Sequence, residues 1–194
     1  MKILVLMAGA RAGAEFFQSL LDGHKQILQI PGILHVNDEL IKVLSIKSKK
    51  KLAEEFIKKY AYYFDSRKSN IERHNMLGLK KKSFYKVNKN FFIKKFLKFS
   101  KKKKRFKNEL FQNLYLIHLA YNFKLRESNI KTFVINAHII PYVINFNSYF
   151  KDIKFDIIHT IRNPLASISS TLKNWTRYKN GFFFTPKELY YNLK

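Results

Sequence analysis

The chain of 194 residues contains no cysteine. Disulfide bonds, thiolate nucleophiles and cysteine-based zinc sites are therefore excluded. Long apolar runs are also missing, since none approaches the roughly 20 residues that cross a bilayer. The short apolar start at residues 1–7 predicts a first strand and not a signal peptide. These absences predict a cytoplasmic protein that is at most peripheral at a membrane surface.

Acidic residues are scarce, with 13 Asp and Glu against 38 Lys and Arg, which gives a formal net charge of +25. Such an excess attracts nucleotides, anionic glycans, phospholipid surfaces or nucleic acid. A second interpretation is that the lysines serve only solubility. Apolar residues make up 46% of the chain and include 19 Phe and 11 Tyr, which excludes a disordered chain and predicts a packed core.

Short apolar runs that alternate with helical patterns predict an α/β fold with a parallel central sheet flanked by helices. The expected strands are Ile3–Met7, Gln26–Ile30, Thr132–Ile135 and Phe155–Ile161. Helices are expected over Ala14–Asp22, from Asn37 or Asp38 to Lys47, over Leu110–Arg126, Val143–Phe150 and Leu165–Trp175, and from Thr185 onwards. The first and last of these strands are both expected to be central.

A lysine-rich segment interrupts this pattern between residues 47 and 107. Its lysine runs alternate with Phe and Tyr, which favours helical insertions between core strands over a separate domain. We therefore predict one domain over residues 1–194, with a core of 1–46 and 108–194 and a lysine-rich helical insertion at about 47–107.

The turn after the first strand is made of small residues and one arginine. It runs through Gly9, Ala10, Arg11, Ala12 and Gly13 into Ala14 and Glu15. Small residues let backbone N–H groups approach an anion, and the following helix adds partial positive charge. A guanidinium adds bidentate geometry. The turn predicts a phosphate cradle but no Walker A loop, because Gly-Lys-[Ser/Thr] is missing. A tight turn with a solvent-facing arginine is the alternative.

A second candidate anion site follows the strand that ends before Arg162. Pro164 starts the next helix, and Ser170 lies eight residues after Arg162. The carboxyl ends of strands in open α/β sheets are where ligands bind. We therefore expect residues 9–13 and Arg162 to lie at the same sheet edge. An ordinary corner between a strand and a helix is the alternative.

Together these segments resemble the PAPS-dependent sulfotransferases, where PAPS is 3′-phosphoadenosine 5′-phosphosulfate. Residues 11–15 align with that family's [Lys/Arg]-Ser-Gly-Thr-Thr turn, which binds the 5′-phosphosulfate. Residues 20–24 resemble its Leu-Leu-Asp-x-His helix ending. Arg162, Pro164 and Ser170 match its Arg-x-Pro…Ser element, which binds the 3′-phosphate. The resemblance implies a P-loop-like three-layer fold, PAPS as co-substrate, no metal, and sulfuryl transfer to a hydroxyl or amine.

The match has departures. Ala12 replaces the usual serine, and Ala14 and Glu15 replace the threonine pair. Three hydroxyl donors are thus missing, although backbone donors remain. The chain also ends at Lys194, where related enzymes usually continue. A truncated, inactive relative that only binds PAP, the desulfated product, therefore stays open as an alternative.

The resemblance also implies a catalytic base. A strand-end histidine at a similar distance upstream of the 3′-phosphate arginine is the base in cytosolic sulfotransferases, and His138 lies 24 residues before Arg162. His138 is the candidate, with Arg11 as partner of the bridging oxygen; a structural hydrogen bond is the alternative role of the histidine. His24 and His35 are weaker candidates, and His118 is expected to pack.

The lysine-rich segment occupies the place of the variable acceptor-binding region in that family. Its aromatic rings and lysines favour an anionic glycan or a lipid head group as acceptor, although the segment also fits a solvated surface. A basic nucleic-acid-binding protein is a rival interpretation, because interleaved lysines and aromatics can hold phosphates and stack bases. A nucleotide kinase is a third, against which the missing Gly-Lys-[Ser/Thr] argues.

Overall fold

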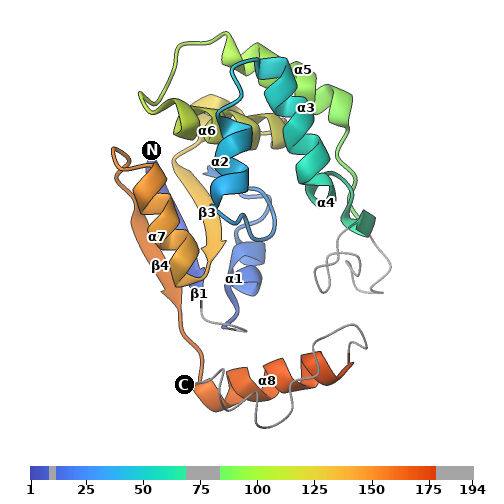
Figure 1. The fold of residues 1–194 in the computed structure, drawn as a ribbon, viewed down its shortest axis with the longest axis vertical. Coiled ribbons are helices and arrows are strands. Elements are labelled where there is room, and N and C mark those ends of the chain that lie inside the picture. Colours follow the sequence, from blue (N-terminus) through green and yellow to red (C-terminus); the bar gives the residue numbers. More distant parts are fainter. Residues whose placement is uncertain (9–11, 69–83, 178–194) are drawn as a thin grey trace.

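The computed structural model describes residues 1–8, 12–68 and 84–177. In chain order the elements are β1 (Lys2–Ala8), α1 (Ala14–Leu20), β2 (Ile27–Leu28), α2 (Asp38–Leu44), α3 (Lys49–Lys59), α4 (Ala61–Phe64), a 3-10 turn (Ser66–Lys68), α5 (Lys89–Ser100), α6 (Glu109–Tyr121), a second 3-10 turn (Glu127–Asn129), β3 (Thr132–His138), α7 (Ile140–Tyr149), β4 (Asp156–Thr160) and α8 (Pro164–Arg177) (Figure 1). The helix predicted from Thr185 lies outside the described residues.

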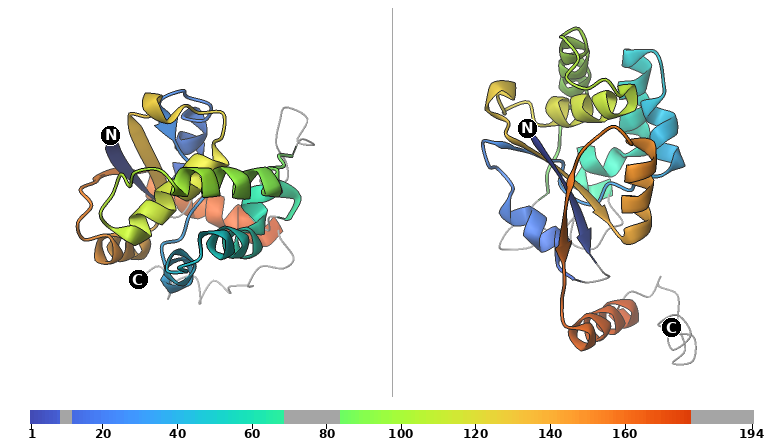
Figure 2. Two further views of the ribbon diagram at one scale, coloured as in Figure 1. Left: turned by 90° about the horizontal axis from the view of Figure 1, so that it is seen from above. Right: turned by 90° about the vertical axis from the view of Figure 1, so that its left-hand side faces the viewer.

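The four strands form one parallel sheet in the order β2-β3-β1-β4, which confirms the predicted α/β class. α1 lies on one face of the sheet, while α6 and α7 lie on the other, so the domain has three layers (Figure 2). The connection from β1 to β2 and the connection from β3 to β4 run in opposite directions across the sheet. They place α1 and α7 on opposite faces, as right-handed crossovers require.

The prediction that both Ile3–Met7 and Phe155–Ile161 are central was half wrong. β1 is internal, between β3 and β4, but β4 pairs only with β1 and forms an edge of the described sheet. Its apolar residues indicated a buried strand, yet Ile157 is 48% exposed and Ile161, just past its end, is 82% exposed. An apolar run shows that a strand can be buried but not which neighbours cover it.

Local capping chemistry sets several helix starts. The side chains of Asn37, Ser48, Asn88 and Asn108 each accept a hydrogen bond from the backbone N–H three residues on, and the predicted Asn37 cap is confirmed. The predicted helix ends were less accurate. The second and third helices were expected to reach Lys47 and Arg126, whereas α2 stops at Leu44 and α6 stops at Tyr121. None of the helices in the described ranges is long and apolar enough to cross a membrane.

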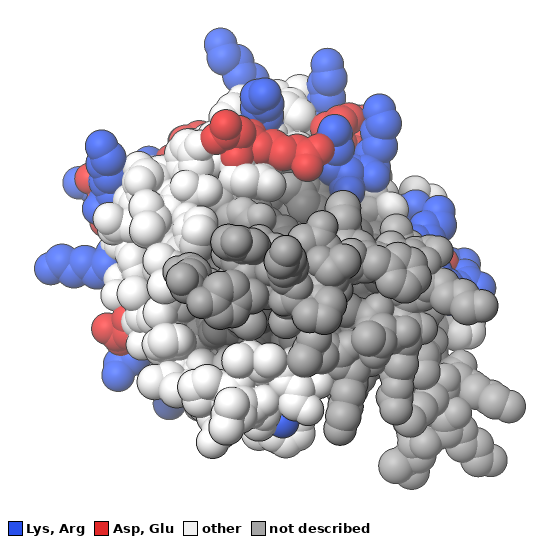
Figure 3. Space-filling model, turned by 60° about the horizontal axis from the view of Figure 1, so that its bottom comes forward, with Lys and Arg blue, Asp and Glu red and all other residues white. Residues whose placement is uncertain are grey.

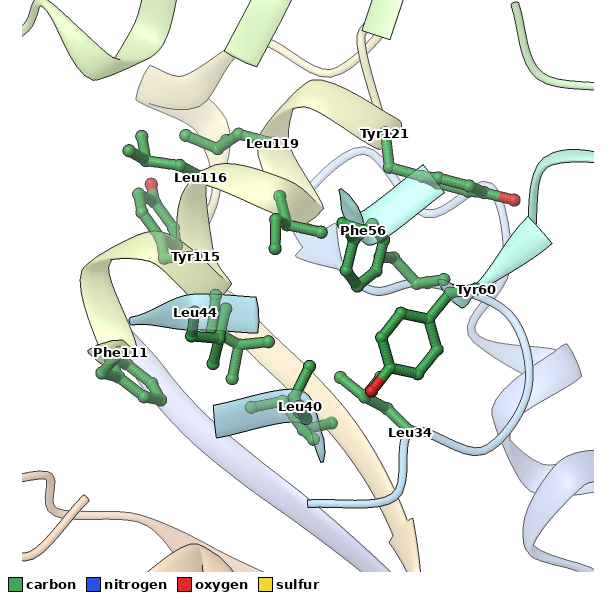
Figure 4. Packing of buried hydrophobic residues seen from close by; sticks show 14 of the residues in the cluster. Leu34, Leu40, Leu44, Phe56, Tyr60, Phe111, Tyr115, Leu116, Leu119 and Tyr121 are labelled. Atoms are coloured by element: carbon green, nitrogen blue, oxygen red, sulfur yellow. The ribbon is translucent and has the colours of Figure 1, made fainter. Parts of the chain in front are cut away.

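The lysine-rich segment is part of the core and does not sit beside it. Phe56 of α3 and both Phe92 and Phe96 of α5 are completely buried, in the same hydrophobic cluster as Phe111 and Phe133. Figure 4 shows Phe56 and Tyr60 packed between Leu34, Leu40 and the residues of α6. Burial of such rings stabilises the fold by about 1.5–3 kcal/mol each, so α3 and α5 contribute directly to the stability of this core.

Candidate functional site

The ends of three strands meet at one edge of the sheet. Ala8 of β1 pairs with Thr160 of β4, and Met7 pairs with His138 of β3, all in parallel ladders. The described strands β1, β3 and β4 therefore end at one edge, from which the chain continues to Ile139 after β3 and to Arg162 after β4. Ligands of open α/β sheets bind at such an edge, whereas the position of Gly9–Arg11 lies outside the described residues and stays a prediction.

The described part of the first turn is open but short of polar side chains. Gly9, Ala10 and Arg11 lie outside the described residues. Gly13 precedes α1 with φ +87°, a left-handed conformation that favours glycine, and its carbonyl accepts from Phe17 N at 2.9 Å. Nothing lies within 4 Å of where a Cβ would stand at Gly13. Ala14 is buried and Glu15 is exposed, so the residue that replaces the family's first threonine faces the core.

His138 ends β3 in a conformation that side-chain-bearing residues avoid. The ladder skips Ala137, because Leu6 pairs with Asn136 and Met7 with His138, which makes a bulge. Ile139 N then donates to Ala137 O at 3.0 Å, closing a three-residue turn around His138, whose φ is +71°. This is the rare, strained hand of the γ-turn. Strain of this kind gathers at functional sites, and His138 lies at the strand-end edge.

Burial keeps the His138 ring neutral. Its Nδ1 is buried and makes no hydrogen bond within the described residues. Burial lowers the pKa of His138, and the nearby charge of His35 lowers it further. A neutral imidazole near pH 7 is the form that can accept a proton.

His35 also lies at this site, although from the sequence it was a weaker candidate for the catalytic base than His138. Its ring stacks on Tyr142 of α7, with 4.3 Å between centroids and 15° between planes. The chain before it is fixed to β3, because Leu34 N donates to Asn136 O at 2.8 Å. Burial also lowers the pKa of His35. His35 thus stacks on Tyr142 and lies close enough to His138 to lower its pKa, an arrangement that no sequence spacing indicated.

The other histidines that the structure describes lie elsewhere. His24 accepts a hydrogen bond from Gln26 N at 3.2 Å just before β2, at the opposite end of the strands. His118 is buried in α6, 4.7 Å from the Phe133 ring, which confirms the packing role predicted for it. Burial lowers its pKa to about 4. His159 lies on β4 and is exposed.

A buried amide pair holds this edge together. Gln18 of α1 donates from Nε2 to Ile30 O at 2.8 Å, and its Oε1 accepts from Asn136 Nδ2 at 3.0 Å and Gly32 N at 3.2 Å. Both side chains are at most 3% exposed. The network links α1, the chain leading to His35 and the end of β3. Asn136 is a polar residue inside the apolar run of β3, and this contrast in the sequence could have indicated that its side chain has a specific partner.

The second predicted anion element begins at the same edge but extends away from it. Arg162 lies two residues after Thr160, and Asn163 Oδ1 accepts from Leu165 N at 2.9 Å and Ala166 N at 3.3 Å to cap α8. Ser170 lies about two turns further along α8, which extends beyond the strand ends and covers neither face of the sheet (Figures 1 and 2). The strand order thus places Arg162 at the site edge, while the approach of Ser170 stays a prediction.

The lysines of α5 lie away from this edge. α5 packs on the far side of α6, at the end of the molecule opposite α8 (Figure 1). In Figure 3, which turns the α8 end forward, most of the visible Lys and Arg side chains of the described residues lie near the rim of the view, together with several Asp and Glu side chains. In the parts of the chain that the structure describes, no three His, Asp or Glu side chains are placed to hold a metal ion.

Comparison with known proteins adds no relative: no family model matches the chain, and no curated protein or solved structure matches it. The resemblance to sulfotransferases therefore depends on the two motifs and on the shared edge.

Proposed function

We propose that this chain binds PAPS at the carboxyl edge of its sheet and transfers the sulfuryl group to a hydroxyl or amine acceptor. The observation that carries the proposal is that β1, β3 and β4 end at one edge, where β3 ends in the strained His138 and β4 leads to Arg162. The P-loop-like character of the fold, the co-substrate and the acceptor class all belong to this proposal.

The charge and the backbone conformation of the described residues fit such a ligand, but the hydroxyl donors expected from the resemblance are missing. The open left-handed Gly13 and the guanidinium of Arg162 suit an anionic nucleotide. The alanines at 12 and 14 offer no hydroxyl donors, so backbone N–H groups and Arg11 would hold the 5′ side. Arg162 and Ser170 would hold the 3′-phosphate.

PAPS supplies an activated sulfuryl group with a phosphate as its leaving group. The protein's part is to position the acceptor in line, take its proton and neutralise developing charge. The His138 ring accepts the acceptor proton, and its lowered pKa favours the unprotonated form of this base. Arg11 lies in the turn that would face the departing oxygen. Acidification should therefore slow transfer, and because the pKa of His138 is lowered, the loss should fall below the ordinary histidine value of about 6.5.

Calorimetric titration of the full chain with PAP tests the binding step. Arg162→Ala should weaken the binding of PAP by about 10- to 150-fold, since charged hydrogen bonds contribute about 1.5–3 kcal/mol. Adenosine 5′-phosphosulfate lacks the 3′-phosphate, so its affinity should change little. Arg126→Ala, an exposed arginine at the other end of the sheet, is the matched control.

His138→Ala tests the chemical step. Sulfuryl transfer should be abolished while PAP affinity stays near that of the parent chain, because a base acts in the transition state. PAP binding by the parent without any transfer would favour the inactive relative. Absence of PAP binding, or tighter binding of ATP than of PAP, would refute the proposal, and ATP preference would favour a kinase.

A further inference from the structure

The opposite end of the sheet carries a dense group of cations. Between residues 84 and 107 the chain has eleven Lys or Arg and no Asp or Glu. We use the name cationic end for the exposed side chains of α5, of the link to α6 and of the chain before β3. They are Lys94, Lys98, Lys101, Lys102, Lys103, Lys104, Arg105, Lys107, Lys124, Arg126 and Lys131.

Specific contacts bring these segments together. Lys102 Nζ lies 2.8 Å from a carboxylate oxygen of Glu127, which joins the link after α5 to the chain before β3. Lys131 O accepts from Lys2 N at 2.8 Å, so this chain lies beside the start of β1. The cationic end therefore surrounds the amino ends of the parallel strands, opposite the candidate site (Figures 1 and 2).

Little negative charge offsets these cations. Within the described residues, the carboxylates paired with them are Glu127, held by Lys102, and Glu109, which Lys104 shares with Lys49. Lys94, Lys98, Lys101 and Lys103 have no ion pair there. By contrast, the groove between α2 and α3 carries both signs, with Lys59 paired to Glu39 at 2.9 Å. Within the described residues, the cationic end therefore carries a larger excess of positive charge than this groove does.

Aromatic rings accompany the lysines. Phe91 and Phe123 contact each other edge to face at 4.7 Å and are 36% and 38% exposed. Lys95 Nζ lies 5.1 Å from the centre of the Phe91 ring, and Lys102 Nζ lies 5.1 Å from that of Phe99. Exposed phenylalanines within a lysine-rich surface suit the interface of an anionic bilayer.

We propose that the cationic end docks on an anionic lipid bilayer. α5 buries Phe92 and Phe96 in the core and presents its lysines outward, as a projecting surface at one end of the molecule. Single-stranded nucleic acid prefers a groove that tracks its backbone between stacking rings, whereas a flat bilayer meets a projecting surface. Lysine, as a compact hydrated charge, suits the diffuse attraction of head groups. Docking in this way turns the candidate site toward solution.

Vesicle co-sedimentation of the full chain tests the proposal. The chain should bind vesicles of phosphatidylcholine mixed with phosphatidylserine, should leave phosphatidylcholine vesicles unbound, and should be released by salt. Each lysine removed should lower partitioning about fivefold, since one lysine near such a surface contributes about 1 kcal/mol.

Two variants with equal loss of charge localise the effect. The test variant carries Lys94→Gln, Lys98→Gln, Lys101→Gln and Lys103→Gln. The control carries Lys42→Gln, Lys58→Gln, Lys68→Gln and Lys86→Gln, exposed lysines outside the cationic end. The first should lose binding roughly a hundredfold or more and the second only a few-fold, with circular dichroism showing that both fold.

Three results would overturn the proposal. Equal binding to neutral and anionic vesicles would show that charge does not cause the binding. Equal losses of binding in the two variants would show that the cationic end is not the surface that contacts the vesicle. Binding of a single-stranded RNA oligonucleotide more tightly than anionic vesicles at the same salt would identify nucleic acid as the partner instead. These results do not depend on PAP binding, so they stand apart from the proposed function.

Discussion

The two ends of the parallel sheet differ in nearly every physical respect. At the carboxyl ends of the strands, the strained His138 lies near His35, whose ring stacks on Tyr142. At the amino ends, exposed lysines crowd over a core of buried phenylalanines. The first end has the features of a site where a small ligand is positioned. The second has those of a surface that attaches to something large and anionic.

The difference teaches that the high positive charge of this chain is not spread evenly. From composition alone, the lysines and the candidate nucleotide site belong to one anion-binding function. In the fold they are separated, because α5 packs on the face of α6 that is turned away from the sheet. The two ends can therefore be altered one at a time.

The largest expected effect tests whether the cationic end depends on the core beneath it. Phe92→Ala should lower the free energy of unfolding by about 3–5 kcal/mol, because it leaves a cavity at a completely buried site. Phe91→Ala, the adjacent and 36% exposed ring, should cost under about 1 kcal/mol. Urea denaturation of both variants measures the difference, and equal losses would show that α5 is only loosely attached.

Two buried glutamines, one at each end of the sheet, allow the two ends to be compared directly. Gln18 bonds to Ile30, Gly32 and Asn136 at the site end, while Gln112 Oε1 accepts from Arg105 N and Phe106 N in the link after α5. Replacing either by Ala should destabilise by about 2–3 kcal/mol, since buried partners lose their hydrogen bonds.

The functional consequences should separate. Gln18→Ala should weaken PAP binding and leave vesicle binding unchanged, whereas Gln112→Ala should do the reverse. Titration and co-sedimentation of the same two preparations provide the measurement. If both variants impaired both kinds of binding, the two ends would not be independent.

The smallest expected effect tests whether the left-handed backbone conformation of His138 is strained. His138→Gly should be more stable than His138→Ala by about 1 kcal/mol, because glycine adopts φ +71° without the cost that a Cβ imposes. Both variants should lack transfer activity. Thermal unfolding compares them, and an equal or lower stability of the glycine variant would show that the turn stores no strain.

Local chemistry let the sequence predict much of the fold. The four strands lie where short apolar runs indicated them, and the Asn37 cap forms as expected because its hydrogen bond closes within three residues. That β1 and β4 end at one edge, as predicted, follows from parallel strand direction alone. His138 at a strand end was also predicted, although its left-handed φ was not.

Only the tertiary structure decided the rest, because it depends on contacts between residues far apart in the chain. Gln18 and Asn136 are 118 positions apart, and their hydrogen bond fixes the chain that leads to His35. No periodicity indicates that His35 stacks on Tyr142, nor that β4 lies at the edge. The separation of the lysines from the site likewise arises when α6 buries its two sides against the sheet and against α5. Apolar periodicity says that a helix will be covered, and packing alone selects what covers it.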